Sequence, residues 1–569
     1  MPKIVTTEQM RAIERAADAQ GHSYAAMMER AGHAVAERVM QLLAGIEQPR
    51  VAVIVGPGNN GGDGLVAARI LAEKLESASV GAFLLKPRGD DEEVFVRARD
   101  AGVFVASADD DKAAGYRALQ NLAANADVLI DALFGTSLRL PIRGDAAKVL
   151  QAAHQAITLR RADRPAPPYT TPADPDLTAP DEGPIIVAVD CPSGLDCDTG
   201  ALDKLTLPAH ETITFAAAKP GLLTFPGAEA VGTLRIADIG LPPRLPELDE
   251  IAQTLVDAAE VRARLPQRPR DSHKGTFGKA MVVAGSLNYT GAAYLAAAAA
   301  YRAGVGLVTV GAPQIIVPVL AGMLPEATWL LLPHDMGVIN EAAVKVLRAE
   351  LAGYSALLLG PGFGREDVTG EFLRELLHPQ EEVRHSRAIG FVPDEPARET
   401  ERTATDLPPL IIDADGLNLL AAMDDWPRLL PPGTILTPHP GEFARLARLD
   451  REEVQANRLP LAQAKAAEWN CVVVLKGAFT VIAAPDGRTA VEPFATSALA
   501  SAGTGDVLAG AIAGLLAQGL APFDAALCAA WLHGMAGVRA AALLDTPISV
   551  TAGDVLELLP EALALATHA

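Results

Sequence analysis

The chain has few of the residues that would mark it as a nucleic-acid binder or a membrane protein. Its 569 residues include 48 Lys and Arg against 70 Asp and Glu, which gives a formal net charge of −22. Binding a phosphate backbone needs clustered cations, so we predict no nucleic-acid partner. We find no apolar run of the roughly 18 to 20 residues that would span a bilayer, so we predict no membrane association.

Cysteine is scarce as well. The four cysteines lie at positions 191, 197, 471 and 528, without C-x-x-C spacing, and are too few to stabilise a chain of this size by disulfide bonds. The first twenty residues are charged and helical in pattern, without the apolar core of a signal peptide. We therefore expect a reducing, cytoplasmic location. The eleven histidines form no HExxH motif or Cys/His cluster, so no zinc site is predicted.

Apolar residues make up half of the chain and follow a regular pattern. Short runs rich in Val, Ile and Leu alternate with longer Ala-rich stretches, which predicts parallel strands covered by helices on both faces. We therefore predict the α/β class with two domains, residues 1–245 and 250–569. The expected strands of the first domain are 51–55, 127–130, 185–189 and 213–215, and those of the second lie between about 281 and 477.

Three stretches interrupt the alternation. Residues 241–270 are rich in Pro and Arg and mark the expected domain boundary. Residues 161–184 and 378–409 resemble insertions, and loops of that length inside a compact domain are uncommon. We assign no structure to either insertion.

A glycine-rich loop, GPGNNGGDG (56–64), directly follows the first expected strand and precedes an expected helix. Free backbone amides at such a helix start can bind an anion. Gly56, Gly58 and Gly61 match the spacing of a dinucleotide fingerprint, but the next strand ends at Lys86 rather than at an acidic residue. This disfavours a Rossmann-type dehydrogenase, and a plain tight turn remains the alternative.

Polar residues follow two further strands of the first domain. Asp131 ends one strand, Asp190 ends the next, and Ser193 comes shortly after it. Because parallel strands end at one edge of a sheet, these residues and Asn60 can meet there, and their oxygens suit a hard cation. The alternative for Asp190 is a structural role in capping the following turn. The CPSG sequence is not a G-x-S-x-G elbow, so a hydrolase is disfavoured.

At this point the motifs NNGGDG, DALFGT, VDCPSG and TFAAAKPG, in this order across about residues 1–240, resemble the NAD(P)H-hydrate epimerase family. The resemblance implies a Rossmann-like three-layer domain that interconverts the R and S epimers of NADHX and NADPHX. It implies Asp190 as the catalytic carboxylate, with Lys219 as an electrostatic helper, and a potassium ion on Asn60, Asp131 and Ser193. The implied hydrate contacts are Asn59, Asn60, Gly61, Gly62, Asp63, Gly135, Thr136, Ser137, Leu138, Arg139, Leu140, Pro141 and Asp190.

The sequence of the second domain contains its own candidate anion site. Gly503, Thr504, Gly505 and Asp506 lead directly into an apolar helix. The pattern indicates a nest of amides for a transferring phosphoryl group, beside a carboxylate that accepts the proton of an attacking hydroxyl. No GxxxxGK[ST] motif is present, which excludes the P-loop class. An ordinary helix start with Asp near its cap is the alternative.

Five motifs of the second half, within about residues 255–565, are similar to the NAD(P)H-hydrate dehydratase family: HKGTFGK, GPGFG, DADGLN, LTPHPGEFARL and VVLKGAFTVI. The similarity implies a ribokinase-like α/β/α domain that consumes ADP, with Mg²⁺, and returns the hydrate to NAD(P)H with release of AMP and phosphate. It implies Asp506 as the catalytic base. The implied hydrate contacts are Ala292, Gly362 or Gly364, His439 and Asp506, and the implied nucleotide contacts are Lys476, Gly477, Ala478, Phe479, Thr480 and Gly505.

Several alternatives stay open. His439 lies between two prolines and can be a loop residue without a catalytic role, and Lys476 can be a surface lysine. The family has GGTGD where this chain has Ala502 before GTGD, which requires a negative φ at Ala502. A ribokinase-type small-molecule kinase with a regulatory N-terminal domain is the competing enzyme hypothesis, and a metabolite sensor is the non-catalytic one. The Ala-rich helices indicate a homo-oligomer.

Overall fold

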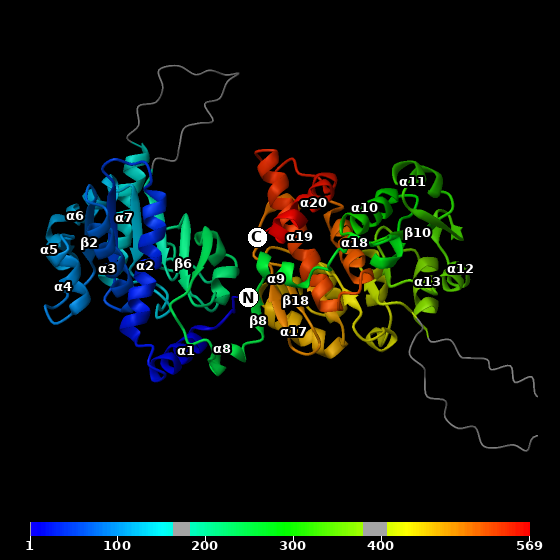
Figure 1. Cartoon of the computed structure of the whole chain (residues 1–569), viewed down its shortest axis with the longest axis horizontal. Coiled ribbons are helices and arrows are strands. Elements are labelled where there is room, and N and C mark those ends of the chain that lie inside the picture. Colours follow the sequence, from blue (N-terminus) through cyan, green and yellow to red (C-terminus); the bar gives the residue numbers. More distant parts are fainter. Residues whose placement is uncertain (1, 163–182, 379–406, 569) are drawn as a thin grey trace, which may run out of the picture. The chain divides into compact units, whose positions relative to one another are not determined.

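The computed structural model describes residues 2–162, 183–378 and 407–568, which fall into two compact units (Figure 1). The first unit spans Pro2–Ile251 and the second Ala252–Ala569. The two expected insertions, 161–184 and 378–409, lie almost wholly outside the described residues.

The first unit is built on a seven-stranded sheet with the order β3-β2-β1-β4-β5-β6-β7, and every neighbouring pair is parallel. The chain builds outward from β1 to β3 and then returns to place β4 on the other side of β1. Ligands of open α/β sheets bind at such a reversal, outside the carboxyl ends of the strands. The strands are β1 Arg50–Val55, β2 Ser79–Leu84, β3 Phe104–Ser107, β4 Val128–Ala132, β5 Ile185–Val189, β6 Glu211–Phe215 and β7 Thr233–Ala237.

Both faces of this sheet are covered. Val51, Val53 and Val55 belong to one hydrophobic cluster, whereas Ala52 and Ile54 belong to another. Alternate residues of a strand point to opposite faces, so β1 is buried on both sides, as its continuous apolar run predicts. The helices of this unit are α1 Thr7–Ala19, α2 Tyr24–Leu42, α3 Asn59–Lys74, α4 Glu93–Asp100, α5 Ala108–Asp111, α6 Arg117–Asn125, α7 Gly144–Ala162 and α8 Pro246–Asp249.

The second unit contains a ten-stranded sheet with the order β11-β10-β9-β14-β15-β16-β17-β18-β19-β8. Its pairs are parallel except β17 with β18 and β18 with β19, an antiparallel segment that the sequence did not predict. The strands are β8 Gln253–Leu255, β9 Lys279–Val283, β10 Leu307–Pro313, β11 Thr328–Leu332, β14 Ala356–Leu359, β15 Leu410–Ile412, β16 Ile435–Leu436, β17 Val472–Leu475, β18 Val481–Ala483 and β19 Thr489–Val491; β12 His334–Asp335 and β13 Val338–Ile339 form a separate ladder.

Small residues hold the helix that carries Asp506 against its neighbour. A Cβ atom at Gly510 would lie 2.0 Å from the carbonyl oxygen of Ala296, so the backbones of α18 and α10 are in direct contact there.

The prediction of two α/β domains is confirmed. The helices are α9 Ala258–Arg264, α10 Thr290–Arg302, α11 Val317–Met323, α12 Ala343–Glu350, α13 Asp367–Leu377, α14 Asp415–Ala421, α15 Pro440–Ala447, α16 Arg451–Ala456, α17 Arg458–Trp469, α18 Thr504–Ala517, α19 Pro522–Leu543 and α20 Ala552–His568.

One described helix, α19, is long and apolar enough to cross a membrane, although no membrane span was expected from the sequence. In its most apolar 18-residue window, with a mean hydropathy of 1.3, 67% is buried inside the protein. Cys528, Ala529 and Ala536 on this helix belong to the hydrophobic core of the second unit. The burial of α19 is that of a core helix.

Candidate active sites

The ends of β4 and β5 are joined by a buried contact. The Ser193 backbone N–H donates to Asp131 Oδ2 at 2.8 Å, and the Ser193 hydroxyl donates to Asp131 Oδ1 at 2.6 Å. Both side chains are fully buried. Burial raises the pKa of Asp131, and the hydrogen bonds from Ser193 oppose that rise. Two of the three residues that the family resemblance assigns to a potassium ion are therefore in contact.

Asn60 lies at the start of α3 and its amide has no partner. Both its Oδ1 and Nδ2 atoms are buried and make no hydrogen bond. A Cβ atom at Gly135 would lie 3.3 Å from Asn60 Oδ1 and 3.3 Å from Asp190 Oδ2, so the loop after β4 brings these groups together because glycine leaves room. An unsatisfied buried amide is costly, and its oxygen is a ligand that a hard cation accepts.

A fully buried lysine fixes Asp190. Lys219 Nζ lies 2.6 Å from Asp190 Oδ1, and the Thr214 hydroxyl donates to the same oxygen at 3.0 Å. Lys219 is 1% exposed and also donates to Thr214 Oγ1 at 2.8 Å. Asp190 itself has a φ of 65°, in the left-handed region that non-glycine residues rarely adopt. The geometry holds Oδ1 in place and leaves Oδ2 directed toward the Gly135 loop.

Two more carboxyl groups surround this pair. Burial, followed by the charge of Asp190, raises the pKa of Asp63 well above its ordinary value and also raises that of Glu14. Both residues line a cavity of about 630 Å³ together with Asn59 and Gly62. The other expected contacts do not line this cavity: Asn60, Gly61, Gly135, residues 136–141 and Asp190. Glu14 was not predicted as a site residue, because its position depends on how α1 packs rather than on a local motif.

In the second unit, Asp506 occupies the first turn of α18. Gly503, with a φ of 89°, caps the helix. Ala502 is not among the residues with positive φ, so the backbone accepts alanine at this position, where the family has glycine. A Cβ atom at Gly505 would lie 3.4 Å from Lys476 Nζ. Burial and the charge of Asp413 raise the pKa of Asp506 to about 7, and Lys476 opposes them. The structure thus brings together Gly505, Asp506 and Lys476.

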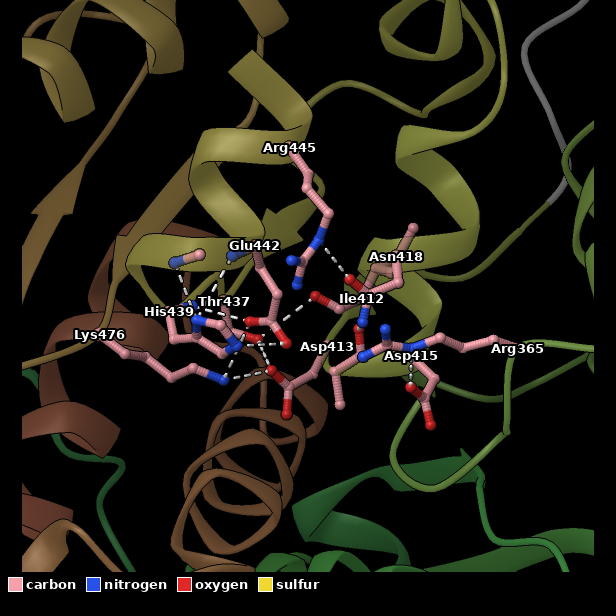
Figure 2. Close-up of polar contacts among 12 residues, drawn as sticks. Arg365, Ile412, Asp413, Asp415, Asn418, Thr437, His439, Glu442, Arg445 and Lys476 are labelled. Atoms are coloured by element: carbon pink, nitrogen blue, oxygen red, sulfur yellow. Dashed lines mark hydrogen bonds and ion pairs between the residues drawn. The ribbon is translucent and has the colours of Figure 1, made fainter. Parts of the chain in front are cut away.

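Lys476 is paired rather than free at the surface (Figure 2). Its Nζ lies 2.7 Å from Asp413 Oδ1, which also accepts a hydrogen bond from the Thr437 hydroxyl at 2.7 Å. Burial disfavours the charged lysine, yet Asp413 and Glu442 raise its pKa overall. Asp413 Oδ2 is buried and has no partner. Asp413 was not among the predicted site residues, although the DADGLN motif that begins with it directly follows a strand.

His439 caps helix α15. Its Nδ1 accepts hydrogen bonds from the backbone N–H groups of Gly441 at 3.0 Å and Glu442 at 3.4 Å, and Glu442 Oε2 accepts from the His439 backbone N–H at 2.8 Å (Figure 2). Burial and the charge of Lys476 lower the pKa of His439 to about 4, so the ring is neutral near pH 7. Burial raises the pKa of Glu442 to about 7. His439 therefore has a structural role as the cap of α15, and it lies at the edge of the site.

The GPGFG loop lies against the start of α10. A Cβ atom at Gly362 would lie 2.8 Å from that of Ala292, so these two expected hydrate contacts are neighbours. The Gly364 N–H donates to Asp415 Oδ2 at 3.1 Å, which ties this loop to the DADGLN segment. On the nucleotide side, the Thr480 hydroxyl donates to the Gly477 carbonyl at 2.9 Å and closes the turn after β17.

Among the described residues, no group of three or more His, Cys, Asp and Glu could hold a metal ion. Among the buried oxygens without partners in the described residues are Asn60 Oδ1 and Asp413 Oδ2, which are oxygens that can bind a cation. With one polar site at the strand ends of each α/β unit, the fold and the sites are those of a two-domain α/β enzyme.

The family comparisons agree with this description. Residues 280–383 and 395–561 match the family model described as NAD(P)H-hydrate dehydratase, and residues 24–221 match that of the YjeF-related protein N-terminus. The bifunctional NAD(P)H-hydrate repair enzyme of Moorella thermoacetica is 36% identical over 549 residues, covering 94% of this chain and 91% of that protein. The chain belongs to the family of bifunctional NAD(P)H-hydrate repair enzymes, as its motifs predicted.

Two more relatives show the extent of the similarity. The bifunctional NAD(P)H-hydrate repair enzyme of Salinibacter ruber is 35% identical over 579 residues, covering 98% of this chain and 96% of that protein. The crystal structure of an ADP/ATP-dependent NAD(P)H-hydrate dehydratase from Bacillus subtilis, co-crystallized with ATP and Mg²⁺, covers 55% of this chain and 98% of that chain, with 32% identity and a TM-score of 0.44.

Proposed function

We propose that this protein restores hydrated nicotinamide cofactors in two steps. The N-terminal domain interconverts the R and S epimers of NADHX and NADPHX. The C-terminal domain then converts the S hydrate to NAD(P)H while ADP becomes AMP and phosphate. The two family matches and the names of the full-length relatives support this function over a ribokinase-type kinase.

The observation that carries the epimerase assignment is the asymmetric setting of Asp190. Lys219 and Thr214 bind Oδ1, and Oδ2 faces the loop at Gly135. Inverting C6 requires reversible proton loss or opening at that carbon, and a carboxylate in a fixed orientation can move the proton. Asp63, with its raised pKa, would hold a proton beside it. The proposed hydrate contacts remain residues 59–63, 135–141 and Asp190.

The same domain offers ligands for a monovalent cation. Asn60, Asp131 and Ser193 would hold a potassium ion, and the unsatisfied amide oxygen of Asn60 supports this assignment. A bound potassium ion would supply positive charge for oxygen atoms of the hydrate. C6 of the hydrate would then lie near Gly135, between the cation ligand Asn60 and the catalytic carboxylate of Asp190.

In the C-terminal domain, Asp506 would deprotonate the C6 hydroxyl of the S hydrate. With a pKa raised to about 7, its carboxylate is a base matched to neutral pH. The hydroxyl oxygen bonds to the terminal phosphorus of ADP and the bond to the bridging oxygen breaks, which releases AMP. The ring nitrogen lone pair then expels phosphate, and loss of a proton from C5 completes the double bond.

The residues around Asp506 would position the nucleotide. Lys476 lies beside Gly505 and would neutralise charge on the transferring phosphoryl group. Gly477, Ala478, Phe479 and Thr480 would line the nucleotide. Asp413, whose Oδ2 has no partner, would hold the Mg²⁺ that accompanies ADP, and Mg²⁺ would stabilise the phosphate charge. Ala292, Gly362, Gly364 and His439 would contact the hydrate.

The test uses purified full-length protein with mixed R and S NADHX and ADP, and follows the absorbance of reduced nicotinamide. Wild type should convert the whole mixture, an Asp190→Asn variant only the S half, and an Asp506→Asn variant none. Accumulation of a phosphorylated hydrate without NADH would contradict dehydration and favour the kinase. We further propose that the protein is a cytoplasmic homo-oligomer, which sedimentation of the purified chain and fractionation of its host would check.

A further inference from the structure

A cavity of about 600 Å³ next to His439 has no role in the assignments above. Three arginines line it, Arg445, Arg448 and Arg451, and none of its lining residues is acidic. Such a concentration of positive charge is unusual in a chain with a net charge of −22. By contrast, the cavity of the N-terminal domain is lined by several carboxylates, including Glu14 and Asp63.

The three arginines come from the end of α15 and the start of α16. Arg445 Nε donates to Asn418 Oδ1 at 2.8 Å, which fixes the direction of its guanidinium (Figure 2). Arg448 caps α15 with a φ of 56°, a left-handed conformation in which glycine is the usual residue. Arg448 lies 3.5 Å from Asp424, and this ion pair is weak because the Arg448 side chain is 78% exposed and that of Asp424 is fully exposed.

The cavity adjoins the site of Asp506 through His439. The His439 ring lines the cavity and lies 3.4 Å from Glu442 Oε1, and Glu442 in turn approaches Lys476. The charges of Arg445 and Arg451 also help to lower the pKa of His439, which places both arginines near its ring. A substrate whose reacting end lies at Asp506 can therefore reach the arginines with its other end.

We propose that Arg445, Arg448 and Arg451 bind a phosphate group of the hydrated dinucleotide, and so determine the affinity of the dehydratase site for its substrate. This inference rests on the proposed function. Guanidinium groups match phosphate oxygens in two-point hydrogen bonds, and His439, being neutral, leaves the phosphate charge to them. The phosphate is either the pyrophosphate, common to both hydrates, or the ribose 2′-phosphate of NADPHX.

The test compares wild type with a double variant, Arg448→Gln with Arg451→Gln, in steady-state dehydration of S-NADHX and of S-NADPHX. Two lost charge-assisted contacts should raise KM for the hydrate by about 10- to 100-fold, with kcat, KM for ADP and epimerisation unchanged. A rise for both hydrates assigns the pyrophosphate, and a rise for NADPHX alone assigns the 2′-phosphate. The matched control is Arg428→Gln, an exposed arginine of the same domain that does not line the cavity.

An unchanged KM for both hydrates would overturn the inference, as would a rise in KM for ADP alone or an equal rise in the Arg428→Gln control. Titration of the full chain with NADPH measures the contribution of the arginines to binding without turnover, by comparison of the dissociation constants of wild type and the double variant. If wild type fails to dehydrate the hydrates while arginine-dependent NADPH binding persists, the proposed function fails and this inference stands. Normal turnover with arginine-independent binding refutes this inference alone.

Discussion

Replacing Asp506 with Asn should stabilise the C-terminal domain while it removes dehydratase activity. Burial raises the pKa of Asp506 from 3.8 to about 7, so the folded domain binds this proton more tightly than the unfolded chain. The stability that Asp506 contributes is therefore present at low pH and is lost as the pH rises from about 4 to 7. Above pH 7 the ionised carboxylate costs about 4 kcal/mol as an upper bound. Asn has a similar shape and avoids this cost.

Tryptophan fluorescence can follow this domain alone. The chain has four tryptophans, at 329, 426, 469 and 531, and all lie in the second unit. In urea unfolding at pH 5 and pH 8, the stability advantage of Asp506→Asn over wild type should grow with pH, toward a few kcal/mol at pH 8. Asp424→Asn, with a fully exposed side chain, is the control and should show no such trend.

The dehydratase activity of the Asp506→Asn variant should fall, although the stability of its domain rises. Loss of the base should slow dehydration by about 10²- to 10⁴-fold and leave epimerisation unchanged. In wild type, kcat/KM for dehydration should rise up to about pH 7 and then level off. A variant that is less stable than wild type by the same amount at pH 5 and pH 8 would refute the burial argument, and dehydration at the wild-type rate would refute the role of Asp506 as base.

Three more substitutions test the packing and the N-terminal site. Lys219→Met should leave Asp190 unpaired, destabilise the N-terminal domain by about 3–5 kcal/mol and stop epimerisation; faster hydrogen exchange in β5 and β6 checks this, and an unchanged epimerisation rate contradicts it. Asn60→Leu should abolish stimulation of epimerisation by added potassium, whereas an unaltered potassium response removes Asn60 from the ion site. Gly510→Val should push α18 away from α10 and reduce both domain stability, by about 1–3 kcal/mol or more, and dehydration; thermal unfolding measures it, and wild-type stability contradicts it.

The parallel strands were predictable because strands buried on both faces have continuous apolar runs. The expected strand at 51–55 corresponds to β1, and that at 185–189 to β5. The antiparallel segment of β18 and β19 was not predicted, since three-residue strands are too short to show a pattern. For the same reason β8, within the stretch 241–270 that breaks the alternation, was missed, although it completes the edge of the second sheet.

Candidate site residues could be proposed where a polar motif follows a strand, as with Asp190, or leads into a helix, as with Asp506. The two lysines of the sites, Lys219 and Lys476, were named through the family resemblance and not from their spacing. Lys219 and Lys476 lie 29 and 63 residues from the carboxylates that they bind. Spacing along the chain carries no signal for contacts of that kind, because they depend on which strands become neighbours. Glu14 and Glu442 were missed for the same reason.

The two domains use one electrostatic arrangement on different sheets. In each, a lysine at the site pairs with one aspartate, Lys219 with Asp190 and Lys476 with Asp413. In each, burial raises the pKa of a further aspartate nearby, Asp63 or Asp506. One cation cannot neutralise two carboxylates, so burial keeps the pKa of the second one raised, to about 7 at Asp506. At Asp506 the charge of Lys476 opposes this rise, so the carboxylate can take up a proton and release it near neutral pH.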